Sequence, residues 1–257
     1  MTLGSVTLPA EKSHSHTVIF LHGRGSSARA LSEKLWEMLD SRNGSLHIRF
    51  PYVKWVFPQA EEVHIERTDH MAKEWFDIWD ARNPDQRREL QAPGLKTAIP
   101  KLVALIQREA VSVGLENIIL AGTSQGCATA VQVLLNYPKP EGSEGGTRLG
   151  GFIGMSGWMS FAGKSVQESR ELLGLEVQGG PAASDEIYRN TPVLITHSAD
   201  DSIVPLKEGE RLRDSLLKYG TKIVYWVEYP NGGHWISGQK GVDDLVTFLV
   251  KLGLHKV

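Results

Sequence analysis

The chain has 257 residues, of which 41% are hydrophobic and 23% are charged, as is ordinary for a globular protein. This composition excludes a collagen-like, low-complexity or wholly disordered chain. There are 28 basic and 30 acidic side chains, giving a formal net charge of -2. Nucleic acid is therefore not an expected partner, because its phosphates are usually bound by a basic surface.

The single cysteine excludes an internal disulfide bond and a cysteine-cluster zinc site. The histidine pairs at positions 14 and 16 and at 64 and 70 are interpreted as surface residues, so no metal site is expected. The N-terminus lacks the basic cluster and apolar run of a secretory signal, and no run of about 18 apolar residues predicts a membrane span. We therefore expect a cytoplasmic protein without integral membrane association.

Short apolar runs alternate along the chain with segments of helical periodicity. The runs predict strands over residues 17–21, 52–57, 117–121, 151–155, 192–196 and 222–229. Apolar residues at three- and four-residue spacing predict helices within 31–39, 95–106, 128–135, 165–173, 206–216 and 245–249. Short buried strands alternating with helices indicate an α/β fold, with a mostly parallel central sheet and helices on both faces.

We expect a single domain over residues 1–257, because no composition break or internal repeat divides the chain. Residues 1–16 are interpreted as a flexible or edge-strand N-terminus, and residues 138–151 and 160–190 as surface insertions. Open parallel sheets bind ligands beyond the carboxyl ends of their strands. The residues that follow each predicted strand are therefore the candidates for chemistry.

Residues 122–126 form the one G-x-S-x-G sequence of the chain, directly after the predicted strand 117–121. In this pattern the strand turns sharply into a helix and presents the serine in a strained backbone conformation. Small residues on both sides let the neighbouring chain approach, and the positive end of the helix favours negative charge at the serine. The motif is short, but the strand before it and the helix after it indicate Ser124 as the nucleophile.

A carboxylate and a histidine follow two later strands. Strand 192–196 is followed by Asp200 and Asp201, and strand 222–229 by a glycine-rich turn that ends at His234. Serine, aspartate and histidine in this order are typical of α/β-hydrolases. The residues alone leave open which aspartate contacts the histidine.

The turn His22-Gly23-Arg24-Gly25 follows the predicted strand 17–21 and can direct a backbone N–H towards the serine. With the N–H of Gln125 it would form an oxyanion hole, which stabilises the negative charge that develops on a reacting carbonyl oxygen. The alternative is a plain glycine-rich turn. His22 is interpreted as orienting this turn rather than as a base, since His234 has the better position.

Five blocks in order resemble the phospholipase/carboxylesterase family, whose best-known members are acyl-protein thioesterases and small carboxylesterases. The blocks are His22-Gly23-Arg24-Gly25, Trp75-Phe76-Asp77-Ile78, Gly122-Thr123-Ser124-Gln125-Gly126, Asp201-Ser202-Ile203-Val204-Pro205 and Gly233-His234. The resemblance implies an α/β-hydrolase fold without a cofactor, and a triad of Ser124, Asp201 and His234. It also implies oxyanion donors from the backbones of Arg24 and Gln125. It selects Asp201 over Asp200, because the family's catalytic aspartate stands directly before x-x-Val-Pro.

The charged segment 61–74 departs from the resemblance, because the equivalent stretch of acyl-protein thioesterases is largely apolar and helps cover a bound acyl chain. Charged side chains beside a long lipid chain would lose hydration. We therefore expect a serine hydrolase that cleaves esters or thioesters of short-chain or polar acyl groups. The alternatives are an acyl-protein thioesterase that removes palmitoyl groups, a lysophospholipase and, in another class, a ligand-binding protein on a hydrolase scaffold.

Three tryptophans near the predicted catalytic edge, Trp75, Trp158 and Trp235, are interpreted as substrate-binding residues, with ordinary packing as the alternative. The expected partner is a small-molecule ester or thioester, or an acylated protein. A homodimer formed by an apolar face near the pocket is left open.

Overall fold

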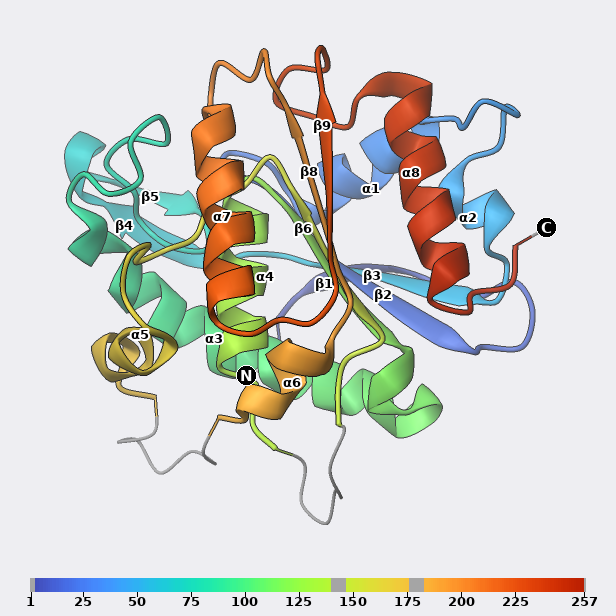
Figure 1. Cartoon of the computed structure of the whole chain (residues 1–257), viewed down its shortest axis with the longest axis horizontal. Coiled ribbons are helices and arrows are strands. Elements are labelled where there is room, and N and C mark those ends of the chain that lie inside the picture. Colours follow the sequence, from blue (N-terminus) through green and yellow to red (C-terminus); the bar gives the residue numbers. More distant parts are fainter. Residues whose placement is uncertain (1–2, 140–146, 176–182, 257) are drawn as a thin grey trace.

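In the computed structural model, helices cover both faces of one seven-stranded sheet (Figure 1). The structure describes residues 3–139, 147–175 and 183–256. The strand order is β1-β3-β2-β6-β7-β8-β9, and neighbouring strands are parallel except for β1, which is antiparallel to β3 at one edge. The expected α/β class, with a mostly parallel sheet between helices, is confirmed.

The strands are β1 (Ser5–Leu8), β2 (His16–Leu21), β3 (Val53–Pro58), β4 (Glu62–Ile65), β5 (His70–Lys73), β6 (Ile118–Thr123), β7 (Gly151–Met155), β8 (Val193–Ser198) and β9 (Val224–Tyr229). All six predicted strands are present, with their ends displaced by at most about two residues, a common uncertainty for such boundaries. The additional strands are β1, which lies in the N-terminal segment 1–16, and the pair β4 and β5.

The helices are α1 (Ala28–Glu37), α2 (Leu46–Arg49), α3 (Gln91–Val113), α4 (Gln125–Leu135), α5 (Val166–Leu173), α6 (Asp185–Asn190), α7 (Leu206–Lys218) and α8 (Gly238–Lys251). The expected helices correspond to α1, α3, α4, α5, α7 and α8. Ser165 begins α5 with a capping box, in which its side chain accepts from the Glu168 N–H and its own N–H donates to the Glu168 carboxylate.

The core lies on both faces of the sheet because the side chains of each strand alternate between them. In β6, Ile118 and Leu120 pack into the cluster that contains α3, α4 and α7, whereas Ile119 and Ala121 pack into the cluster that contains α1 and α8. Figure 1 shows α1 and α8 on one side of the sheet and α4 and α7 on the other. Every residue of β6 is buried, as expected of a central parallel strand.

The charged segment 61–74 contains an antiparallel hairpin, in which β4 and β5 are joined by a short 3₁₀ turn, η1 (Glu66–Thr68). The ion pairs of Glu61 with Lys101 and of Glu66 with Arg87 connect it to the rest of the chain. One residue of the hairpin, Ile65, is fully buried. Polar and apolar residues alternate over only four positions in β4 and not at all in β5, so the hairpin is absent from the strands expected of the sequence.

The two expected insertions are described only in part. Residues 140–146 and 176–182 lie outside the described residues. The described parts of 160–190 contain α5 and α6, and Pro138 forms a β-bridge with Ala183. Among the described helices, none has the length and apolar character needed to cross a membrane.

Gly94 allows α3 to lie against the segment that follows the hairpin. A Cβ atom at this position would come within 2.4 Å of Phe76 Cα and 2.6 Å of the Trp75 carbonyl oxygen, both of them backbone atoms. The helix can pack this closely because glycine has no side chain. Contact with backbone leaves little room for local adjustment.

We predict that Gly94→Ala destabilises the protein, although alanine is ordinarily the better helix former. Overpacking of this kind costs about 1–3 kcal/mol of unfolding free energy, and each kcal/mol lowers the Tm of a protein of this size by about 2–4 °C. Thermal unfolding measures the effect. Gly4→Ala is the control, because a Cβ atom there meets no other atom within 4 Å. A Tm of Gly94→Ala equal to or above that of the parent chain would contradict the prediction.

Candidate active site

Ser124 occupies the sharp turn between β6 and α4, with φ 55° and ψ -124°. The two glycines of the motif permit this turn. A Cβ atom at Gly122 would lie 2.4 Å from the Gly126 backbone, and one at Gly126 would lie 2.4 Å from the Leu21 carbonyl oxygen. The elbow is thus pressed against the end of β2, and the serine lies beyond the carboxyl end of β6 as the motif predicts.

Asp201 and His234 are brought together from two neighbouring strand ends. Asp201 lies in the loop after β8, and its Oδ2 is 2.8 Å from Nδ1 of His234, which lies in the turn after β9. Its other oxygen, Oδ1, accepts hydrogen bonds from the N–H groups of Ile203 and Val204, each at 2.9 Å. The carboxylate is buried and held at both oxygens, so it can orient the imidazole.

The environment of Asp201 favours its charged form. Burial by itself would raise the pKa of Asp201, but hydrogen bonds from His197, His234 and the Val204 N–H outweigh this effect. The pKa of Asp201 is therefore held well below its usual range. A permanently charged carboxylate can stabilise an imidazolium next to it, as a triad requires.

Asp200, the neighbouring aspartate, binds elsewhere. Its carboxylate is exposed and accepts from the N–H groups of Gly233 at 2.8 Å and Gly232 at 3.4 Å. It thereby holds the glycine turn that leads to His234, while Asp201 contacts the imidazole itself.

His197 is a buried residue that supports Asp201. Its Nε2 is 2.9 Å from the Val204 carbonyl oxygen and 3.3 Å from Asp201 Oδ2. Because a carbonyl oxygen only accepts, Nε2 must carry the hydrogen and donate it. The ring packs on α7, where a Cβ atom at Gly209 would lie 2.3 Å from His197 Nδ1. The sequence signal for the contact between His197 and α7 is Gly209, a glycine inside the predicted helix 206–216.

Within the described residues, Ser124 Oγ makes no hydrogen bond to His234 Nε2. The imidazole lies on a turn in which Gly232 and Gly233 have φ values of 149° and 60°, and it remains partly exposed. The structure therefore brings Asp201 and His234 into contact and places Ser124 on the elbow, and among the described residues no hydrogen bond joins His234 to Ser124.

The turn after β2 lies directly against the nucleophile. A Cβ atom at Gly23 would be 3.2 Å from Ser124 Cβ. His22 orients this turn, since its Nε2 accepts from the Ala60 N–H and its Nδ1 therefore donates to the Gly23 carbonyl oxygen, at 2.9 Å. Burial lowers the pKa of His22, which favours this neutral form. Arg24, the expected oxyanion donor, is the next residue.

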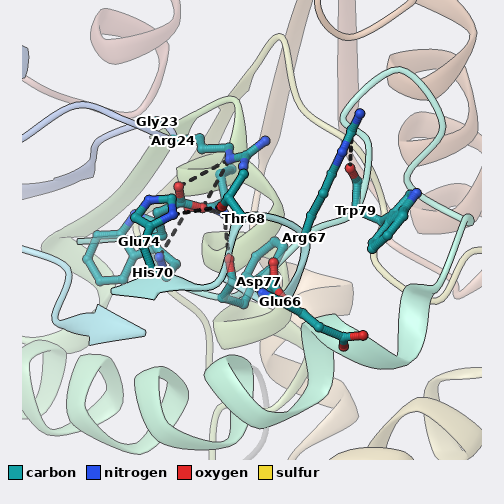
Figure 2. Close-up of polar contacts among 12 residues, drawn as sticks. Gly23, Arg24, Glu66, Arg67, Thr68, His70, Glu74, Asp77 and Trp79 are labelled. Atoms are coloured by element: carbon teal, nitrogen blue, oxygen red, sulfur yellow. Dashed lines mark hydrogen bonds and ion pairs between the residues drawn. The ribbon is translucent and has the colours of Figure 1, made fainter. Parts of the chain in front are cut away.

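The side chains of Arg24 and Gln125 meet at one buried carboxylate. Arg24 Nε donates to both oxygens of Glu74 at 3.1 Å, and Gln125 Nε2 donates to Glu74 Oε2 at 3.2 Å. Figure 2 shows Arg24 and Glu74 facing each other, with Gly23 beside Arg24. The backbone donor roles of Arg24 and Gln125 remain predictions.

The three tryptophans differ in their surroundings. Trp75 is buried and donates from Nε1 to the His22 carbonyl oxygen at 2.8 Å. Trp158 is also buried, with its ring edge-on to Phe76. Trp235 is partly exposed, and Lys34 Nζ lies 4.1 Å from its ring centroid. Contact with substrate stays a prediction for all three.

A cavity of about 620 Å³ lies beneath the β4–β5 hairpin, between the hairpin and the start of α3. Its lining includes Trp75 and Glu74 together with carboxylates of Glu61, Glu62 and Asp77. Trp75 and Glu74 also contact the elbow through Gln125, so the wall of this cavity and the elbow share these two residues. No cluster of three or more metal-ligating side chains occurs in the described part of the chain.

Comparison with known proteins agrees with this geometry. A family model described as Phospholipase/Carboxylesterase matches residues 4–252. Acyl-protein thioesterase 1 of Schizosaccharomyces pombe is 29% identical over 205 residues, which cover 79% of this chain and 76% of that protein. The crystal structure of Zea mays acyl-protein thioesterase 2 has a TM-score of 0.73 at 21% identity, and the match covers 97% of this chain and 98% of that one. For the crystal structure of esterase PE8 the TM-score is 0.67 at 25% identity, with 98% and 100% covered.

The parallel sheet with a serine elbow after its central strand defines an α/β-hydrolase. Because the family match spans nearly the whole sequence, the chain belongs to the phospholipase/carboxylesterase family, as the five sequence blocks predict. It is a serine hydrolase of carboxylic esters or thioesters.

We predict that Asp201→Asn lowers kcat by up to about 10⁴-fold, because an amide can no longer hold the imidazole in the required tautomer or stabilise its charge. Asp200→Asn is the matched control, since the amide oxygen of asparagine can still accept from the N–H groups of Gly232 and Gly233 that the Asp200 carboxylate binds. We expect that variant to retain kcat within a few-fold of the parent enzyme, because exposed polar changes have small effects. Steady-state hydrolysis of p-nitrophenyl acetate measures both. A large fall of kcat in Asp200→Asn together with a small fall in Asp201→Asn would assign the triad role to Asp200 instead of Asp201.

Proposed function

We propose that Ser124 attacks the carbonyl carbon of an ester or thioester and forms an acyl-enzyme, which water then hydrolyses. His234 takes the Ser124 proton and returns a proton to the leaving alcohol or thiol, while Asp201 orients and stabilises the imidazolium. In the second step His234 takes a proton from water as the water oxygen attacks the acyl carbon, and it returns that proton to Ser124 Oγ as the acyl–oxygen bond breaks and the acid leaves. The N–H groups of Arg24 and Gln125 donate to the carbonyl oxygen as it becomes negative.

The observation that carries this proposal is the backbone of Ser124. A φ of 55° is strained for a residue other than glycine, and such strain persists where the surrounding structure enforces it. Here Gly122 and Gly126 permit the close packing that enforces it. The contact from His234 to Ser124 is expected to close with substrate bound, because catalytic hydrogen bonds often tighten only in the complex.

Ser124→Ala is expected to abolish ester hydrolysis while leaving the fold intact, since the hydroxyl makes no hydrogen bond within the described structure. A fluorophosphonate should label the parent enzyme covalently and fail to label the variant, as intact-protein mass spectrometry would show. Ser156→Ala is the control, because Ser156 is also a buried serine, with a φ of 47°. Undiminished hydrolysis by Ser124→Ala would refute the proposal. A folded parent enzyme that neither labels nor turns over would support a ligand-binding protein instead.

For the substrate we propose a short-chain or polar acyl group. The supporting observation is the hairpin, whose residues Glu62, His64, His70 and Lys73 are exposed and charged or polar, and which borders a cavity whose lining includes several carboxylates. A long alkyl chain placed against such groups would remove water from them without replacing their hydrogen bonds. The relatives named acyl-protein thioesterase favour the alternative, removal of an acyl group from a protein.

We predict that kcat/KM on p-nitrophenyl esters is highest for acetate or butyrate and falls for octanoate and palmitate. Thioesters of the same acyl groups, assayed with a thiol reagent, would show whether kcat/KM differs between a sulfur and an oxygen leaving group. A palmitoylated peptide and lysophosphatidylcholine complete the series. A maximum at palmitate, or rapid cleavage of either of these two substrates, would assign the long-chain alternative.

We further propose that the protein acts in the cytoplasm, on a small ester or thioester or on an acylated protein. The supporting observation for location is its one cysteine, Cys127, a buried free thiol. Burial raises the pKa of Cys127 to about 12, so it remains a neutral side chain of the core. The homodimer stays a prediction that sedimentation would test.

A further inference from the structure

We propose that Glu74 is a positioning residue for the oxyanion hole, and that Arg24 neutralises it so that its charge does not oppose catalysis. The inference rests on the proposed function, because it takes the backbones of Arg24 and Gln125 as the oxyanion donors. It assigns a role in the reaction to a residue of the charged segment 61–74, which the triad leaves unused.

Glu74 connects the two halves of the oxyanion hole. The donors come from segments far apart in the sequence, the turn after β2 and the start of α4. Glu74 is 6% exposed, and it accepts from Arg24 Nε at 3.1 Å and from Gln125 Nε2 at 3.2 Å. Figure 2 shows the carboxylate of Glu74 facing Arg24. A charged acceptor strengthens both hydrogen bonds, and its burial reduces screening by water.

The residues after Glu74 extend the same connection. The Gln125 amide also donates to the Phe76 carbonyl oxygen at 2.8 Å and accepts from the Trp75 N–H at 3.1 Å. Trp75 Nε1 donates to the His22 carbonyl oxygen, one residue before Gly23. Gln125 is thus fixed by three residues in succession. Arg24 has one acidic partner in this network, Glu74, so the turn depends on that carboxylate more than the helix start does.

The charge of Glu74 sets a second requirement. A buried carboxylate one side chain away from the oxyanion donors would repel the negative charge that develops on the substrate. Paired with the Arg24 guanidinium, the group has no net charge, and it holds the donors without that repulsion. We therefore expect loss of the Arg24 guanidinium to lower kcat more than loss of the Glu74 carboxylate does.

The first experiment is Glu74→Gln, which keeps the size of the side chain and removes its charge. We expect kcat for p-nitrophenyl acetate to fall about tenfold, less than the 10²–10³ that follows loss of a whole oxyanion donor, because both backbone N–H groups remain. KM should stay within about twofold, because the donors act on the transition state rather than on the bound ester.

Glu109→Gln is the matched control for a purely structural effect. Glu109 lies on α3 and has the same exposure, 6%, and its carboxylate pairs with Nζ of Lys54 on β3 at 2.7 Å. We expect this variant to lower the Tm in the same way as Glu74→Gln but to leave kcat unchanged. An equal fall of kcat in both variants would overturn the positioning role.

The second experiment removes the cation and then restores neutrality. Arg24→Met leaves Glu74 buried without its cation, and we expect kcat to fall about a hundredfold, since an unpaired buried charge is strongly unfavourable. The double variant Arg24→Met with Glu74→Gln removes that charge and should return kcat to the level of Glu74→Gln alone. The double variant can still be measured if one of the single variants folds poorly. A double variant no better than Arg24→Met would overturn the neutralising role.

Inhibition by a trifluoromethyl ketone measures the strength of the oxyanion hole directly. Its carbonyl carbon bonds to Ser124 Oγ, the serine proton passes to His234, and the ketone oxygen becomes an oxyanion. We expect Glu74→Gln to weaken this inhibitor by the same factor as it lowers kcat/KM, and unchanged inhibition would contradict the inference. Failure of the proposed function has a different signature, hydrolysis by Ser124→Ala. An inactive Ser124→Ala together with a Glu74→Gln variant like the parent enzyme would reject only the role of Glu74.

Discussion

The close approach of β6, α4 and β2 at the serine elbow is the constraint on which the site depends. Two missing Cβ atoms, at Gly122 and Gly126, let the helix start lie within contact of the Leu21 carbonyl oxygen. That packing holds Ser124 at a positive φ and places it beside Gly23. The same packing therefore sets the positions of Ser124 and of the turn at Gly23, because a change that separates β6, α4 and β2 moves both.

Asp201 and His234 reach the same edge of the sheet through its topology and through one buried supporting residue, His197. β8 and β9 are parallel neighbours, so the loops after them, which carry Asp201 and His234, emerge on the same edge. Asp201 is fixed there by two backbone N–H groups and by His197, and His197 is fixed in turn by α7 at Gly209. The orientation of the imidazole thus depends on Gly209 through the contacts of His197 and Asp201.

Local sequence patterns predict the features that they encode directly, and they do not predict those that depend on packing between distant segments. The buried strand β6 and the elbow at Ser124 have strong local signals, so the sequence alone indicates both. The hairpin has no such signal, because it is held by ion pairs such as that of Glu66 with Arg87 rather than by an apolar pattern. The link from Glu74 to Arg24 spans 50 residues, and no spacing rule relates them.

The charged segment 61–74 lies both beside the cavity and next to residues that contact the elbow. Its hairpin carries charged and polar groups beside a cavity, and its last residue before Trp75 binds the side chains of Arg24 and Gln125, the proposed oxyanion donors. Movement of the hairpin would therefore be transmitted through residues 74–76 to Gln125, which they hold by three hydrogen bonds. If the proposed substrate preference and donor roles hold, changes in this one short segment alter acyl preference and turnover together. A substitution that makes the hairpin apolar must preserve the pairing of Glu74 with Arg24 if it is to change the preferred substrate without lowering kcat.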